Sequence, residues 1–191
     1  MCSITDKITT VELLYGKNLR TFLNLDVKEK GPADVWVYNM ELTFFEDLFC
    51  EFVENNDMRI LCDYRARVMT AAFCLNHPRV SAKHWSKNGM LHSKCIIFPT
   101  RSVVYLGSHN FTWFAWNSGQ NLTIRTTHKG LAGEVAAKFE KQWISGLPII
   151  PDELLRNCDT LNNGRQQHTP AVPLCCDTEA DSPATYRVSE T

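Results

Sequence analysis

The residues with the clearest chemical potential stand in the segment 91–124, which reads LHSKCIIFPTRSVVYLGSHNFTWFAWNSGQNLTI. It opens with an H-x-K pair, His92 and Lys94. A histidine can attack phosphorus or transfer protons near neutral pH, and a lysine offers a fixed positive charge to a phosphate oxygen. On a strand, side chains two residues apart face the same way and are separated by about 7 Å. The pair therefore predicts a phosphate site at the start of a strand, near the rim of a sheet.

A second polar group, Gly107-Ser108-His109-Asn110, follows at a fixed distance along the chain. A turn at Pro99–Arg101 and a returning strand at Ser102–Leu106 are expected to bring it back beside the first pair. Glycine permits close approach of the backbone. Ser108 and Asn110 supply neutral hydrogen-bond donors, which suit an oxyanion. The two groups together predict a site for phosphate chemistry.

Alternating strands and helices are expected to position these residues. The expected strands are rich in β-branched and aromatic residues and cover Asp34–Tyr38, Arg59–Cys62, Val80–Trp85, Leu91–Phe98, Ser102–Leu106 and Asn121–Arg125. The expected helices run from a capping box at Thr43–Glu46 to Asn55, over Arg65–Leu75, and through Leu131, Val135, Phe139 and Trp143. Lys87-Asn88-Gly89 is expected to turn, and Gly107–Gly119 to be irregular or partly helical. The alternation predicts an α/β fold with a mixed sheet flanked by helices.

Composition bounds the class of protein. The chain has 191 residues, 44% of them hydrophobic and 21% charged, which is enough for one domain with an ordinary core. From Asn157 onward the sequence is polar and lacks periodicity, so we predict one domain over residues 1–156 and a disordered tail over 157–191. The formal net charge is -1, which argues against a strongly basic nucleic-acid coat. Acids outnumber arginines in the tail, so the body is mildly basic.

The sequence also bears on location. It has no run of about 18 apolar residues, and its start, MCSITDKITT, lacks the pattern of a secretory signal. Its eight cysteines form no C-x-x-C pair, which indicates free thiols in a reducing compartment. We therefore expect a cytoplasmic protein without a transmembrane segment.

An H-x-K pair followed by strand, turn, strand and G-S-x-N resembles the phospholipase D superfamily, also called the HKD family. The likeness covers about residues 33–145, because a strand–helix–strand unit precedes the motif and a strand and an amphipathic helix follow it. It implies that one histidine attacks a phosphodiester and forms a phosphohistidine, while a second protonates the leaving oxygen. Lysines and Asn or Ser groups then hold the phosphate, and neither metal nor cofactor is required. By this resemblance His92 matches the nucleophile or acid, Lys94 the phosphate lysine, and Ser108 and Asn110 the G-S-x-N positions.

The resemblance extends to three further features. Gln120 matches a downstream Glu or Gln that hydrogen-bonds a catalytic imidazole, which a Gln carbonyl can do without adding charge. Pro99 stands where the motif's Asp is expected, and the tyrosyl-DNA phosphodiesterases also lack that Asp. Only one H-x-K occurs in the chain. Small single-motif members of the family build one active site across a symmetric dimer, so the resemblance implies a homodimer with a shared site.

Three functions fit this pattern. The first is a nuclease that cleaves DNA or RNA phosphodiesters, favoured by the small single-motif architecture and the mildly basic body. The second is a phospholipid hydrolase acting on cardiolipin or a phosphatidyl lipid. The third is a non-catalytic nucleic-acid-binding or scaffold dimer that keeps the fold alone.

Some residues around the motif carry two interpretations each. Besides Gly107, the candidate substrate-binding residues are Trp113 and Trp116, which either stack on a base or acyl chain or simply cover the core. Four cations either line a phosphate-binding cleft or form a solvated face, namely Arg65, Arg67, Lys83 and Lys87. A zinc site at Cys74, His77 and His84 would lack a fourth spaced ligand, so no metal is expected.

Overall fold

The computed structural model of the chain describes residues 10–85, 89–118, 120–152 and 154. Their central feature is an eight-stranded sheet in the order β1-β7-β6-β5-β2-β3-β4-β8. The strands are β1 (Val11–Leu14), β2 (Ala33–Val37), β3 (Met58–Cys62), β4 (Val80–His84), β5 (Cys95–Phe98), β6 (Val103–Gly107), β7 (Thr123–Thr126) and β8 (Leu147–Pro148). β2, β3 and β4 run parallel, whereas β5 runs antiparallel to β2 and to β6. The sheet is therefore mixed, as predicted.

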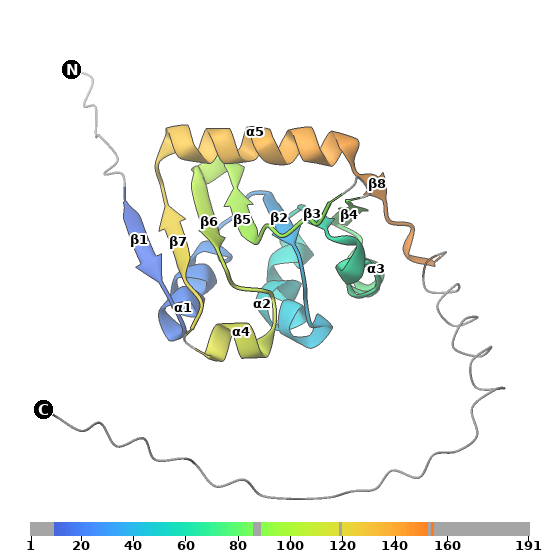
Figure 1. Cartoon of the computed structure of the whole chain (residues 1–191), viewed down its shortest axis with the longest axis horizontal. Helices are drawn as coiled ribbons and strands as arrows, with labels where there is room; N and C mark the ends of the chain where they lie inside the picture. The colour runs from blue at the N-terminus through green and yellow to red at the C-terminus, as the bar shows by residue number, and fades with distance from the viewer. Residues whose placement is uncertain (1–9, 86–88, 119, 153, 155–191) are drawn as a thin grey trace, which may run out of the picture.

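Helices cover both faces of this sheet. They are α1 (Lys17–Asp26), α2 (Leu42–Asn55), α3 (Arg67–Asn76), α4 (Trp113–Asn117) and α5 (Lys129–Ser145), with short 3₁₀ turns η1 (Tyr64–Ala66) and η2 (Pro99–Arg101). The long α5 lies on one side of the sheet, and α1, α2 and α3 lie on the other (Figure 1). All five residues of β2 are buried, as expected for a strand that is covered on both faces.

Each face has its own hydrophobic core. The larger core is rich in aromatic side chains, because the buried stripe of α2 carries four phenylalanines, Phe44, Phe45, Phe49 and Phe52. The smaller core packs Phe139 of α5 against Trp36 of β2, with ring centroids 5.2 Å apart. Cys62 and Cys95 are buried within these cores, where a thiol acts as a small hydrophobe.

The predicted capping box at the start of α2 is wrong. Thr43 lies inside the helix, whose N-cap is Glu41, and no side chain caps it. Glu41 is extended, and its N–H donates to the carbonyl of Phe111. A tertiary contact therefore sets the start of α2, and the Thr43 hydroxyl accepts instead from Trp113 Nε1.

The strand predicted from Leu91 begins only at Cys95. The N–H of Leu91 donates to the Asp63 carboxylate, 3.0 Å away, so this segment is held by a side chain and does not pair as a strand. β1, α1 and β8 had no counterpart in the prediction. The predicted tail at 157–191, and Lys87 and Asn88 of the predicted turn, lie outside the described residues.

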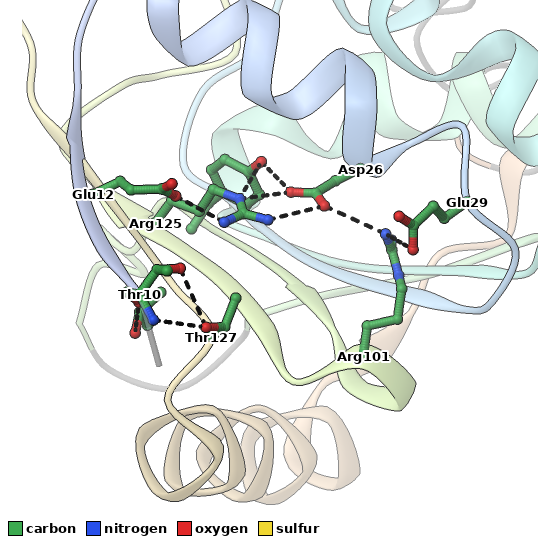
Figure 2. Close-up of polar contacts among 9 residues, drawn as sticks. Thr10, Glu12, Asp26, Glu29, Arg101, Arg125 and Thr127 are labelled. Carbon is green, nitrogen blue, oxygen red and sulfur yellow. Dashed lines mark hydrogen bonds and ion pairs between the residues drawn. The ribbon is translucent and has the colours of Figure 1, made fainter. Parts of the chain in front are cut away.

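A buried carboxylate ties α1 to β6 and β7 (Figure 2). Asp26, the last residue of α1, accepts hydrogen bonds from the Tyr105 hydroxyl and from Arg125 Nε, the latter at 2.8 Å. Arg125 also pairs with Glu12 of β1 at 2.7 Å, and Arg101 of η2 lies 3.5 Å from Asp26. This network joins strands on which the position of the Gly107 loop depends.

Among the described residues, no helix is both long enough and apolar enough to cross a membrane.

Candidate active site

One edge of the sheet collects the polar loops. The carboxyl ends of β2, β3 and β6 point to the same edge, because β5 runs antiparallel between β2 and β6. The segment that leads into β5 starts from that edge as well. The loops after β2, β3 and β6 therefore meet the H-x-K pair, as is usual for ligand sites at the carboxyl ends of parallel strands.

His92 and Lys94 are in direct contact at this edge. Lys94 Nζ lies 2.9 Å from His92 Nε2 and donates to the His92 carbonyl at 2.8 Å. His92 is exposed, whereas Lys94 is only 7% exposed. An ammonium group can only donate, so a neutral His92 accepts at Nε2 and carries its proton on Nδ1. In this tautomer the Nε2 lone pair accepts from Lys94 Nζ, so an anion that binds the ammonium group would free Nε2.

The charge on Lys94 is not neutralised by a carboxylate in the part of the chain that the structure describes. Its ammonium group contacts only His92 and the face of the Tyr38 ring, whose centroid is 4.5 Å away. Burial lowers the pKa of Lys94 from its ordinary value. An anion at this position would restore the lost solvation and favour the charged form.

Tyr38 is a site residue that the sequence patterns did not single out. Its ring packs edge-on against His92, with centroids 4.4 Å apart, and so supports both members of the pair. It directly follows the last residue of β2. That place, just beyond the end of a buried parallel strand, is the signal that could have identified it.

Asp63 and Arg65 are further residues at this edge. The buried Asp63 follows β3, and its carboxylate accepts from the backbone N–H groups of Arg65 at 3.1 Å and of Leu91 at 3.0 Å. It therefore fixes the loop after β3 to the segment that enters His92. Arg65 is exposed, and its Nη1 donates to the Tyr38 hydroxyl at 2.5 Å.

Gly107 brings the G-S-x-N loop to Lys94, as the sequence predicts. Its N–H donates to the Lys94 carbonyl at 3.2 Å. A Cβ at this position would lie 2.2 Å from Thr123 Oγ1 and 2.5 Å from the Leu122 carbonyl, so only glycine fits. Ser108 follows on the exposed edge, where its hydroxyl donates to Asn121 Oδ1 at 3.2 Å.

Asn110 lies in the same loop, and Trp113 and Trp116 lie in the helix α4 that follows it. Asn110 is half-buried, and its Oδ1 has no hydrogen-bond partner among the described residues. Trp116 is buried, packs on Phe44 and donates to the Asn110 carbonyl at 2.9 Å, which favours the core interpretation for this residue. Trp113 is 38% exposed, with its ring edge against Phe44, and it keeps a free surface.

Gln120 is exposed, and its described contact is the backbone N–H bond to Ser118. No contact between Gln120 and His92 is present within one chain. Asn121, the next residue, contacts Ser108 instead. The expected support of a catalytic imidazole by Gln120 therefore stays a prediction.

The other described histidines are engaged elsewhere. His109 is buried and, with Lys94, lines a cavity of about 20 Å³. Its Nδ1 is 2.7 Å from Thr123 Oγ1, and burial lowers its pKa to about 4. His77 pairs with Glu46, and His128 caps α5 at the opposite edge of the sheet. His84 lies against Tyr64 at the end of β4. None of these rings contacts His92.

Two of the candidate cleft cations are also engaged elsewhere. Lys83 Nζ donates to the Trp143 carbonyl at 2.9 Å, and Arg67 lies over the Tyr64 ring at 3.4 Å. Lys87 is outside the described residues. Within those residues, no group of three His, Cys, Asp or Glu side chains is placed to hold a metal ion.

Comparisons with known proteins agree with this fold. Residues 51–143 match the family model described as cardiolipin synthase, phospholipase D-like domain. No curated protein matches the sequence.

Several solved structures share the fold. Nuc, a phospholipase D family member from Salmonella typhimurium, is 18% identical with a TM-score of 0.63, and the match covers 74% of this chain and 98% of that one. NucT from Helicobacter pylori is 13% identical with a TM-score of 0.59, covering 74% and 99%. Phosphatidylserine synthase from Haemophilus influenzae Rd KW20 is 13% identical with a TM-score of 0.60, covering 85% of this chain and 48% of that one. From its family model and its fold, the domain that contains residues 51–143 belongs to the phospholipase D superfamily.

Proposed function

We propose that the chain is a metal-independent nuclease that cleaves DNA or RNA phosphodiesters through a phosphohistidine on His92. The observation that carries the proposal is the contact between the exposed His92 Nε2 and the buried, unneutralised Lys94 Nζ at an open sheet edge. A poised nitrogen nucleophile beside a fixed cation is what attack on a phosphodiester anion requires. The phosphodiesterase domain is assigned to residues 1–156.

In the first step, His92 Nε2 attacks phosphorus, a P–N bond forms and the P–O bond to the leaving group breaks. Lys94 stabilises the charge on the nonbridging oxygens, and Ser108 and Asn110 supply further hydrogen bonds from the adjoining loop. The leaving oxygen must take up a proton. Water then attacks the phosphohistidine, which releases the product phosphate and restores His92.

The proton donor is proposed to be His92 of the partner subunit. Among the described residues, one chain offers one exposed imidazole at this edge. His109 is buried with a lowered pKa, and His84 at the carboxyl end of β4 is half-buried against Tyr64. His77 pairs with Glu46, and His128 lies at the opposite edge. Two copies that face each other across a twofold axis would place an imidazole on each side of one phosphorus. The second chain is also the proposed source of the Gln120 contact to a catalytic ring.

A phospholipid substrate is the second candidate, because the matched family model is described by cardiolipin synthase. The chemistry at phosphorus is the same for both substrates. Purified protein assayed in EDTA on single-stranded DNA, on RNA and on cardiolipin vesicles separates them. We expect the wild-type chain to cleave nucleic acid and His92→Ala not to. Rapid quenching of a reaction with a phosphate-labelled oligonucleotide should trap the label on the wild-type chain. Activity that vanishes in EDTA and returns with magnesium would refute the mechanism, and cleavage of the vesicles alone would refute the substrate.

A further inference from the structure

Arg65 is an exposed cation without an acidic partner among the described residues. Its Nη1 donates to the Tyr38 hydroxyl at 2.5 Å and lies 3.8 Å from Met90 Sδ, and no described carboxylate forms an ion pair with it. Every other described arginine except Arg67 forms such a pair. The Arg67 guanidinium is covered by the Tyr64 ring and bonded to the Tyr64 carbonyl at 2.7 Å. Arg65 therefore keeps donors free toward solvent at the active-site edge.

The position of Arg65 is fixed relative to His92 by two independent links. Its backbone N–H is held by Asp63, whose other carboxylate oxygen holds the backbone just before His92. Its side chain is held by Tyr38, which packs on the His92 ring. The guanidinium carbon is 5.7 Å from the Tyr38 centroid, and that centroid is 4.4 Å from the centroid of His92. The free guanidinium thus lies at most about 10 Å from the His92 centroid. This is at most about three phosphate spacings, since a strand carries a phosphate about every 3.4 Å of duplex axis.

We propose that Arg65 binds a phosphate next to the one that is cleaved, and so makes the site selective for a polyphosphodiester chain over a solitary phosphodiester. A guanidinium suits this task, because it stays charged and presents a planar fork of donors to phosphate oxygens. Tyr38 holds the fork through one nitrogen and leaves the others available. The inference rests on the proposed function, because it assigns the substrate class of the same site.

The test compares Arg65→Ala with Arg79→Ala. Arg79 is a matched control, because it is exposed, pairs only with Asp57 at 3.4 Å and precedes β4 at the opposite edge of the sheet. Removing either arginine changes the net charge equally, so a difference between them reports position and not overall charge. Tyr38→Phe is the second variant, since it keeps the ring against His92 and removes the hydroxyl that positions Arg65.

Two measurements are made on the full-length chain. The first is kcat/KM on a single-stranded oligonucleotide and on bis(p-nitrophenyl) phosphate, which has one phosphate. The second is the affinity of each chain for a labelled oligonucleotide at several salt concentrations. For this measurement every chain also carries the His92→Ala substitution, which prevents turnover. For Arg65→Ala we expect the ratio of kcat/KM on the oligonucleotide to kcat/KM on bis(p-nitrophenyl) phosphate to fall about tenfold. This is the scale of one charge-assisted contact. The slope of log Kd against log salt should fall by about 0.7, the value for one phosphate contact on a single strand. Tyr38→Phe should lower the same ratio by a smaller factor.

Arg79→Ala should leave both the ratio and the slope at the wild-type values. Equal losses on both substrates for Arg65→Ala, or a slope equal to that of Arg79→Ala, would overturn the proposal. If the wild-type chain cleaves neither substrate, the proposed function fails, while the salt dependence of binding still decides the role of Arg65.

Discussion

Removal of the His92 imidazole tests the nucleophile and the shared site together. The ring is exposed, and its described contacts are Lys94 Nζ and the Tyr38 ring. We expect His92→Ala to cost only about 1 kcal/mol of unfolding free energy, the scale of one exposed hydrogen bond and one ring contact. Lys94 keeps its bond to the backbone carbonyl at position 92, so the phosphate cation stays in place. Turnover should nevertheless fall by a factor of up to about 10⁶, because the covalent step loses its nucleophile.

The decisive measurement mixes this variant with the wild-type chain. If subunits pair at random around a twofold axis, a wild-type chain finds a wild-type partner in proportion to the wild-type fraction. At equal amounts, activity per wild-type chain should fall to about half, and at a threefold excess of variant to about one quarter. A mixed dimer has one imidazole for two tasks, and it stalls before or at the phosphohistidine. A plot of activity per wild-type chain against the wild-type fraction should therefore be a straight line through the origin.

The assay uses two differently tagged chains, so that native mass spectrometry verifies exchange before turnover is measured. His128→Ala is the control for loss of an exposed imidazole, since His128 lies at the opposite edge of the sheet, at the start of α5. Its activity per chain should equal that of the wild type, apart from a small loss of stability at the helix cap. Constant activity per wild-type chain after verified exchange, or a monomer in solution, would refute the shared site.

Three further predictions concern the surroundings of His92. Gln120→Ala should lower kcat by roughly 10–100-fold, the scale for a residue that orients a catalytic ring, and an unchanged rate would remove Gln120 from the site. Gly107→Ala should destabilise the fold by about 1–3 kcal/mol in chemical denaturation, because its Cβ meets Thr123 Oγ1 and a backbone oxygen. His109 has a folded pKa lowered to about 4, below its unfolded value, so the unfolded chain binds the extra proton and stability is lost as pH falls from about 6.5 toward 4. Between pH 6.5 and 5 this loss should be about 2 kcal/mol, and it should be absent from denaturation curves of His109→Leu.

The local pattern of residues 91–110 predicted much of the site, for reasons that the structure makes clear. Four apolar residues, Cys95–Phe98, form a buried central strand, so the polar pair before them must lie at its open end. Gly107 was predicted to permit close backbone approach, and a Cβ at this position would clash with Thr123 and the Leu122 carbonyl. The sequence predicts His92 and Lys94 on one face of a strand, about 7 Å apart. Neither residue lies in a strand, and their side chains are in contact. Asp63 holds the backbone at Leu91, so the pair is fixed at this edge without strand pairing.

Tyr38 and Asp63 show what a single sequence leaves out, and Arg65 was only one of four candidate cations whose place the sequence did not determine. They precede His92 by 27 residues or more, and only the strand order brings them to its side. Each follows a buried strand, but the sequence does not say whether that strand lies next to β5 or at the far end of the sheet. The helix α1 was missed for a different reason. Its buried stripe is narrow, with Leu19 and Leu23 on an otherwise polar sequence, so tertiary packing and the Asp26 network hold it.

The departure from the family motif at Pro99 can now be placed in the fold. Pro99 follows β5 and begins η2, so it lies at the edge of the sheet opposite His92 and Lys94. A buried carboxylate is present near that edge all the same, because Asp26 of α1 accepts hydrogen bonds from Tyr105 and Arg125 and lies beside Arg101 of η2 (Figure 2). Two arginines near η2 and β7 thus find their counterion on another element. A carboxylate from α1 therefore lies close to η2, at the edge of the sheet opposite His92 and Lys94. Activity should therefore depend on His92 and Lys94, and stability on Asp26.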